Sequence, residues 1–228
     1  MRKRLYHHLT FKSKKDWIGS RVIGGTTASQ ICGHNKWKSK MEVYLDLTGR
    51  LRPTEINNEA VKRGQLLEPH LRALFGVNFP QFKVLNPRSF DMYVRNDKPY
   101  MTATLDGRLI HKITKKKYIL EIKTHDIRNR ADEEEWNNTI PSYYFDQIMW
   151  YLAVMTDYEG AYLEAHLNFY DYFNADGKKL LRTEIRYYYY DRRDEEIARY
   201  IKYIENTCTQ FWEENIVKGI PPKTTIEF

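Results

Sequence analysis

The stretch YILEIKT, residues 118–124, places an acid and a base one residue apart within an otherwise apolar segment of β-forming residues. Side chains alternate between the two faces of a strand, so Glu121 and Lys123 project from one face while Leu120 and Ile122 project from the other. One interpretation is an ion pair on the solvent face of an edge strand. The alternative is a functional site that uses a carboxylate and an amine side by side.

Other strand-like segments surround this stretch. The link KITKKK, residues 112–117, is typical of a hairpin loop and predicts that the segments on either side of it pair with each other. A second hairpin is predicted near the C-terminus, with its turn at Asp176-Gly177. The expected strands are Lys83–Asn96, Thr102–His111, Tyr118–His125, and residues 161–172 and 180–190.

Helical spacing, capping residues and terminal glycines predict the helices. Thr26 and Thr27 are candidate N-caps, and Pro69 lies inside a helical pattern, where it predicts a kink or a local start. The run from Phe145 to Met155 is nearly all apolar and predicts a buried helix behind Pro141. The expected helices cover residues 24–33, 39–47, 59–75, 141–157 and 194–217.

The order of these elements is helices, three strands, a buried helix, two strands and a final helix. This order predicts an α/β or α+β fold in which a central mixed sheet is flanked by helices. With 228 residues, 42% of them hydrophobic, the chain can bury one substantial core, so a single domain is expected over residues 1–228. Its helical part is expected over about residues 1–80, and its sheet core and C-terminal helix over about residues 81–228.

The chain carries 37 Lys and Arg against 30 Asp and Glu, a net charge of +7. Such an excess attracts polyanions such as nucleic acid or an anionic membrane, and it also occurs on soluble basic proteins without such a partner. Cys32 and Cys208 form no disulfide or Cys-x-x-Cys pattern, so a reducing cytosol is expected. No apolar run is long enough for a membrane span, and no secretory signal is visible behind the basic N-terminus.

Asp106, in TLDGRLI, approaches Glu121 if the strands on either side of KITKKK form a hairpin. Two neighbouring carboxylates repel each other unless a cation or a proton lies between them. Carboxylate oxygens and water are ligands that Mg²⁺ takes, usually with substrate phosphates, and Lys123 could then help to activate a water or neutralise charge on the phosphate. A charged hairpin surface, or a simple turn at Asp106-Gly107, also explains the pair.

Two polar residues stand out in the predicted helices. Glu68 lies about 60° around its helix from Leu71, so it borders the buried stripe and needs a partner. That partner is either a metal shared with the two carboxylates or an ordinary salt bridge to Arg63 or Arg72. Gln147 falls inside the apolar helix, where a buried amide needs hydrogen bonds, either structural ones or ones that position a carboxylate or a water.

These residues together resemble the core of the PD-(D/E)xK nucleases, also called restriction-endonuclease-like. The matching blocks are Glu68, Asp106-Gly107, Glu121-Ile122-Lys123 and Gln147. More narrowly, the chain is similar to the YqaJ-like viral recombinase, or phage lambda exonuclease, family. This similarity spans about Trp17 to Leu163 and includes IGGTTAS (23–29), RGQLLE (63–68) and YYFDQIMWYL (143–152). Leu105 stands where the superfamily often has proline.

The resemblance implies a metal-dependent catalytic site. Asp106 and Glu121 would be the shared metal ligands, with the carbonyl oxygen of Ile122 as a further ligand. Glu68 would help to hold a second ion. The ions would be Mg²⁺, with Mn²⁺ as an alternative, and two per site. The two remaining members are Lys123, which would orient and activate the attacking water, and Gln147, which would support the site at its edge.

The resemblance also implies a site for the 5′-terminal phosphate of the digested strand. Ser29 aligns with a serine that contacts this phosphate. Arg21 lies near the arginine of the family, one residue from its usual spacing, and Thr104 falls where a hydroxyl lies next to the phosphate. A helix N-terminus flanked by Gly24 and Gly25 would present free N–H groups to an anion.

The implied function is 5′-to-3′ digestion of linear double-stranded DNA, which leaves 3′ single-stranded tails for phage-type recombination by single-strand annealing. The implied partners are DNA ends, preferably 5′-phosphorylated, a single-strand annealing protein and two further copies in a homotrimeric ring, with no membrane. The expected location is the cytoplasm of a bacterial host, with a phage or prophage origin. The lysines of residues 112–117 and the basic N-terminus either line the DNA path or are solvated. The role of Asn96-Asp97 is open.

Other functions stay open on the residues alone. The same core occurs in endonucleases of repair or restriction, and it could be a relic in a non-catalytic DNA-binding scaffold. Retention of Glu68, Asp106, Glu121 and Lys123 together argues against a relic. Four iron–sulfur cysteines mark the Cas4-like nucleases, and this chain has two cysteines. A Ser-His-Asp hydrolase is disfavoured because Gly-x-Ser-x-Gly is absent from the sequence.

Overall fold

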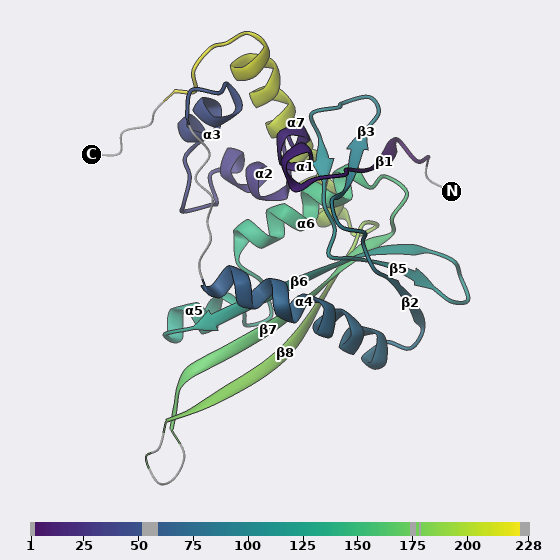
Figure 1. The fold of residues 1–228 in the computed structure, drawn as a ribbon, viewed down its shortest axis with the longest axis vertical. Coiled ribbons are helices and arrows are strands. Elements are labelled where there is room, and N and C mark those ends of the chain that lie inside the picture. The colour runs from purple at the N-terminus through teal and green to yellow at the C-terminus, as the bar shows by residue number, and fades with distance from the viewer. Residues whose placement is uncertain (1–2, 52–58, 174–176, 178, 224–228) are drawn as a thin grey trace.

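A computed structural model describes residues 3–51, 59–173, 177 and 179–223. The expected α+β fold, with a central mixed sheet flanked by helices, is confirmed (Figure 1). The large sheet has the strand order β2-β5-β6-β7-β8, in which β6 is antiparallel to β5 and parallel to β7. Its strands are β2 (Phe82–Leu85), β5 (Gly107–His111), β6 (Lys117–Ile127), β7 (Gly160–Phe173) and β8 (Lys179–Asp191).

A smaller sheet has the order β1-β3-β4, formed by β1 (Tyr6–Thr10), β3 (Asp91–Arg95) and β4 (Thr102–Ala103). The strand β1 lies within the part of about residues 1–80 that was expected to be helical, and it joins that part to the small sheet. Its pairing partner, β3, lies some 85 residues further along the chain, with Tyr6 opposite Arg95. The local sequence carries little information about so distant a pairing.

Two segments expected to be single strands are each divided between the two sheets. Residues 83–96 form the end of β2 and, across Pro87, the strand β3. Proline cannot donate a ladder hydrogen bond, and Phe90 has a positive φ of 64°, so the strand breaks there. Residues 102–111 likewise divide into β4 and β5, separated by the three residues Thr104 to Asp106.

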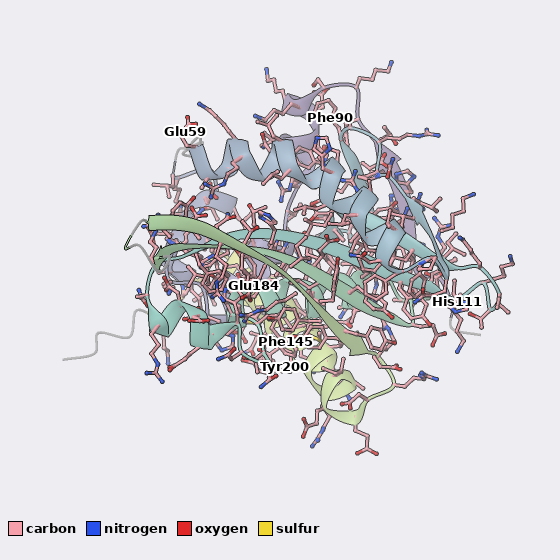
Figure 2. The ribbon with its side chains drawn as sticks, turned by 90° about the horizontal axis from the view of Figure 1, so that it is seen from below. Glu59, Phe90, His111, Phe145, Glu184 and Tyr200 are labelled. Carbon is pink, nitrogen blue, oxygen red and sulfur yellow. The ribbon has the colours of Figure 1, made fainter. Side chains whose placement is uncertain are left out.

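Helices cover both faces of the large sheet. Against one face lies α4 (Glu59–Asn78), whose Leu71 and Phe75 pack on Leu120 of β6. Against the other lies α6 (Ser142–Val154), which is nearly all buried and packs with Ile119 of β6. Figure 2 shows Glu59 of α4 on one side of the sheet and Phe145 of α6 on the other. The alternation predicted for YILEIKT is therefore confirmed.

Two of the remaining helices, α2 and α7, pack against α6. The bounds of all the remaining helices are α1 (Lys14–Ser20), α2 (Gly25–Cys32), α3 (Lys40–Leu47), α5 (Arg130–Glu135), α7 (Glu195–Phe211) and the π-helix η1 (Trp212–Val217). The helix expected over residues 194–217 thus changes its hydrogen-bonding pattern at Trp212. The N-cap of α2 is Gly24, not Thr26 or Thr27. Ser39 caps α3 in a capping box with Glu42.

Several details settle smaller expectations. Pro69 lies inside the continuous helix α4, and Pro141 is the N-cap of α6. Within the turn expected at Asp176-Gly177, only Gly177 is described, with a φ of 72°. Although they are far apart in the sequence, Cys32 and Cys208 are neighbouring free thiols, and burial and the nearby Cys32 raise the pKa of Cys208. Within the described ranges, no helix has the length and apolarity to cross a membrane.

Candidate active site

The site begins where the ladder between β5 and β6 stops. Gly107, the first residue of β5, pairs with Leu120. One step further, the backbone N–H of Ile122 donates to Asp106 Oδ2 at 2.8 Å, so a side-chain carboxylate takes the place of a strand carbonyl. The N–H and C=O of a strand residue point to the same side, so the carbonyl of Ile122 also faces Asp106. This hydrogen bond holds the carboxylate of Asp106 beside the middle of β6.

Glu121 lies on the face of β6 that packs against α6. Its side chain is 1% exposed, and Oε1 accepts hydrogen bonds from Lys123 Nζ at 2.5 Å and from Gln147 Nε2 at 2.8 Å. Gln147 Nε2 also donates to the hydroxyl of Tyr151 at 2.9 Å. Glu121 Oε2 is buried and has no hydrogen-bond partner among the described residues. One oxygen is therefore held in place while the other is left for a ligand.

Glu68 reaches the same place from α4. It forms an ion pair with Arg72, one of the two arginines expected for this role, while Arg63 pairs with Asp126. Arg72 Nε also donates to the backbone carbonyl of Asp106 at 2.5 Å. Arg72 thus connects Glu68 to the residue that ends the β5 ladder.

The electrostatics of the three carboxyl groups reflect their closeness. Burial, and next the charge of Asp106, raise the pKa of Glu121 to about 8, against the opposing effect of Lys123. Burial also raises the pKa of Asp106, while burial and the charge of Asp106 raise that of Glu68. Burial opposes the charge on Lys123, yet Glu121 and Asp106 raise its pKa. The carboxyl groups therefore resist ionising together, a conflict that a cation relieves.

The donor set suits a hard divalent cation. Carboxylate and carbonyl oxygens are the ligands of Mg²⁺ and Mn²⁺, and the unpartnered Oε2 of Glu121 is one such oxygen. In the described part of the chain, no group of three or more His, Cys, Asp or Glu side chains is arranged for a metal. Instead, the amine of Lys123 pairs with Glu121, and the guanidinium of Arg72 pairs with Glu68. The oxygen ligands therefore suit such an ion. To bind it, Glu121 and Glu68 would have to separate from Lys123 and Arg72.

The N-terminus of α2 lies against this site. A Cβ on Gly25 would come within 2.4 Å of Gln147 Cγ and 2.9 Å of Tyr151 Cε1, so only glycine allows this approach. Arg21 Nη2 lies 3.5 Å from the position of a Cβ on Gly24, and the Arg21 guanidinium lies 4.8 Å from the ring centroid of Trp17. The first turn of α2 and Arg21 are therefore together, next to the residues that hold Glu121.

The other two residues expected at the phosphate are placed differently. Ser29 is 1% exposed, and its hydroxyl donates to the carbonyl of Thr26 at 2.8 Å and accepts from Asn35 Nδ2 at 3.3 Å. It lies a full turn inside α2 and is engaged with its own helix. Thr104 is half-buried in the link between β4 and β5, two residues before Asp106. No hydrogen bond joins Arg21, Ser29 and Thr104 within the described ranges.

Reasoning from the sequence missed two tyrosines of the site. Tyr151 accepts a hydrogen bond from Gln147, and the ring centroid of Tyr144 lies 5.0 Å from Lys123 Nζ, within the range of a cation–π contact. Both flank Gln147 at helical spacing on α6, and that spacing is the signal that identifies them. Asp97, whose role was open, forms an ion pair with Arg95 at 2.6 Å.

Comparison with known proteins relates this arrangement to one family. A profile of the YqaJ-like viral recombinase domain matches residues 16–159. The uncharacterized protein YqaJ of Bacillus subtilis (strain 168) is 30% identical over 213 residues, which make up 92% of this chain and 59% of that protein. The chain thus spans about three fifths of the length of this relative.

Solved structures are similar in fold. An alkaline exonuclease (LHK-Exo) from Laribacter hongkongensis superposes with a TM-score of 0.52 at 17% identity, over 88% of this chain and 94% of that chain. A structure of LHK-Exo in complex with dAMP gives a TM-score of 0.51 at 17% identity, over 87% and 91% of the two chains. The family profile covers more than half of the chain, including the elements that carry Glu68, Asp106, Glu121 and Gln147. The chain therefore belongs to the YqaJ-like viral recombinase family.

Proposed function

We propose that this protein is a Mg²⁺-dependent exonuclease that digests linear double-stranded DNA from its 5′ ends. The observation that carries the proposal is the convergence of Glu68, Asp106 and Glu121 at the end of the β5 ladder, with Lys123 beside them. Three carboxylates and an amine that lie close together, with Glu121 fully buried among them, are costly to maintain, and phosphodiester hydrolysis uses all of them. The fold shared with an alkaline exonuclease supports the same reaction class.

The residues have separate tasks in this proposal. Asp106, Glu121 and the Ile122 carbonyl would hold one ion, and Glu68 would help to hold a second. A bound divalent cation supplies Lewis acidity, which lowers the pKa of water and offsets charge on the phosphate. Gln147 keeps Oε1 of Glu121 in position. Lys123, displaced from Glu121 by the ion, would orient the attacking water.

The direction of digestion rests on the first turn of α2. Its free N–H groups and Arg21 suit a terminal 5′-phosphate. Because Ser29 is buried and bonded to its own helix, we propose that main-chain N–H groups and Arg21 make the principal contacts. Thr104 is a secondary candidate. Mn²⁺ is expected to substitute for Mg²⁺.

The biological setting is a further part of the proposal. Digestion of 5′ strands leaves 3′ single-stranded tails, on which a single-strand annealing protein acts in phage-type recombination. A homotrimeric ring would thread the duplex and keep the enzyme on it. The setting that suits this activity is the cytoplasm of a bacterial host, with the protein encoded by a phage or prophage.

Three substrates test the proposal. Purified protein with Mg²⁺ should rapidly degrade linear duplex DNA with 5′-phosphates, slowly degrade the same duplex with 5′-hydroxyls, and leave covalently closed circular DNA intact. Chelation with EDTA should stop the reaction. Efficient cutting of the closed circle would instead identify an endonuclease, and inactivity on all three substrates would favour a non-catalytic scaffold.

A further inference from the structure

A pocket lies away from the carboxylates, between the two sheets. It encloses about 240 Å³. Arg108 and Lys117 line it from the face of the large sheet that also carries Glu121, because Arg108 pairs with Ile119 across the ladder. Lys117 precedes Glu121 by four residues on β6, which is about 13 Å along the strand. The lining also includes Arg4, Tyr6, His8, Leu85, Tyr93, Ile110 and Tyr158.

The basic groups of this pocket differ in how they are neutralised. Lys117 Nζ pairs with Asp157 at 2.6 Å, and His8 Nε2 lies 2.9 Å from an oxygen of Asp91. Arg4 and Arg108 form no ion pair with any described residue. Arg4 donates to the Tyr6 carbonyl at 3.1 Å.

Arg108 is the more constrained of the two arginines. Its Nε is buried without a hydrogen-bond partner among the described residues. Its other contact is uncharged: the guanidinium lies 5.9 Å from the ring centroid of Tyr93. Burying a guanidinium N–H without an acceptor costs free energy. A bound anion that accepts its hydrogen bond would recover part of this cost.

The shape of the pocket selects a small anion rather than a base. One face of Tyr93 is stacked by His8 at 4.8 Å, and the ring of Tyr6 is covered by Arg4 at 4.7 Å, so neither ring is open for a nucleobase. A phosphate group matches the fork geometry of guanidinium groups and tolerates nearby lysine. The exposed Lys115 and Lys116 continue the positive charge from the mouth of the pocket along the β5–β6 loop.

We propose that the Arg108 pocket, lined by Arg4, Arg108 and Lys117, binds a phosphate group of a nucleotide or of the DNA backbone. As a contact to the DNA substrate it rests on the proposed nuclease function, and it would hold the duplex on the same face of the sheet as the carboxylates. As a site for a free nucleotide phosphate it is independent of that function.

Phosphate binding is tested on the metal-free full chain. Inorganic phosphate and thymidine 5′-monophosphate are titrated against chloride at constant ionic strength, and the thermal midpoint is followed. We expect Arg108→Gln and Arg4→Gln each to weaken the apparent phosphate affinity by roughly tenfold. Arg4 is exposed, so its variant keeps the test valid if Arg108→Gln folds poorly. Arg199→Gln, on the exposed face of α7, is the charge-matched control and should bind like the wild type.

Duplex binding then distinguishes the two sources of phosphate. With a 5′-hydroxyl duplex in EDTA, a DNA backbone contact predicts that Arg108→Gln lowers the slope of log affinity against log salt by about 1. An unchanged slope with lost phosphate stabilisation assigns the pocket to a free nucleotide phosphate. Phosphate stabilisation that is equal in the wild type, Arg108→Gln and Arg4→Gln would overturn the proposal. Because neither assay needs catalysis, failure here is separate from failure of the exonuclease assay.

Discussion

At the scale of single residues, Glu121 has one carboxylate oxygen held by two donors, while the other is buried and has no donor within the described part of the chain. The two donors have different consequences. Gln147 is neutral and can only orient the carboxylate, whereas Lys123 also neutralises it. In the proposed reaction, a bound cation would therefore replace the amine of Lys123, which would then be free to act on water or phosphate.

Lys123→Ala should abolish cleavage while DNA binding survives. The reason is that Lys123 is 17% exposed beside Glu121, where it can reach the reacting groups but contributes little to a duplex surface. Cleavage of labelled linear duplex and a binding assay in EDTA measure the two effects separately. Lys202→Ala, on the exposed face of α7, is the control. Wild-type turnover in Lys123→Ala would contradict the assigned role.

A second buried glutamate gives a prediction for pH. Glu164 on β7 is 0% exposed, both its oxygens lack hydrogen-bond partners among the described residues, and burial raises its pKa from 4.5 to about 8. Between these pH values the folded protein binds a proton there that the unfolded chain has released. The stability contributed by protonated Glu164 is therefore lost as the pH rises toward 8.

Glu164→Gln should remove this loss. We expect the variant to match the wild type near pH 4.5 and to be more stable than the wild type at pH 8, because an amide carries no charge to desolvate. Urea unfolding at both pH values in metal-free buffer measures the difference. Glu196→Gln, exposed on α7, should show no such pH dependence. Equal stability of Glu164→Gln and wild type at pH 8 would show that this carboxyl is not buried in its charged form.

At the scale of elements, the contact between α2 and α6 places the turn that we propose to bind the 5′-phosphate next to the residues that hold Glu121. Gly25→Ala should lower kcat by roughly 10²-fold, because the added Cβ would displace Gln147, and with it Glu121, by an ångström or so. Gly19→Ala is a matched control, since a Cβ there meets nothing within 4 Å. Steady-state digestion rates compare the two variants, and equal rates would exclude the coupling.

The packing of α4 on the sheet gives a prediction for stability. Phe75 is 0% exposed and its ring lies 4.4 Å from Phe79 and 5.6 Å from Tyr162. Phe75→Ala should lower the free energy of unfolding by about 3–5 kcal/mol, through lost burial and a cavity. Leu66→Ala, at a position of the same helix that is 74% exposed, should change it by less than about 0.5 kcal/mol. Denaturant unfolding of both variants tests whether α4 packs against the large sheet through Phe75.

At the scale of the whole molecule, two sheets and a shell of helices bring residues from distant segments to one place. The hairpin of β7 and β8 runs to the far end of the molecule, away from α2 and α3 (Figure 1). The carboxylates lie instead near the centre of the large sheet, between α4 and α6. In the proposed exonuclease reaction, a duplex end would have to reach this central position.

Light scattering tests the proposed homotrimeric ring. A homotrimer predicts a mass three times that of the chain, and digestion of a long duplex should then continue after excess unlabelled DNA is added. Continued digestion reflects a closed ring that cannot leave the duplex between cleavages. A monomeric mass, together with digestion that stops when the competitor is added, would contradict the ring.

Local patterns predicted much of this architecture. The alternation in YILEIKT assigns Glu121 and Leu120 to opposite faces of β6, and the glycine-flanked stretch 24–33 predicts α2, because both depend on backbone geometry over a few residues. The segment 102–111 was wrongly predicted as one strand. Its break depends on the hydrogen bond from Ile122 to Asp106, which joins residues that only the hairpin brings together.

The sequence by itself determined which residues have the chemistry for a nuclease site and which elements carry them, since periodicity and residue type are local properties. Only the tertiary structure decided how their charges are distributed. Arg72 rather than Arg63 pairs with Glu68, and the hydroxyl of Ser29 bonds to its own helix. The two arginines of the Arg108 pocket have no carboxylate partner among the residues that the structure describes. These outcomes follow from burial and from distances between segments far apart in the chain, on which desolvation and Coulomb energies depend.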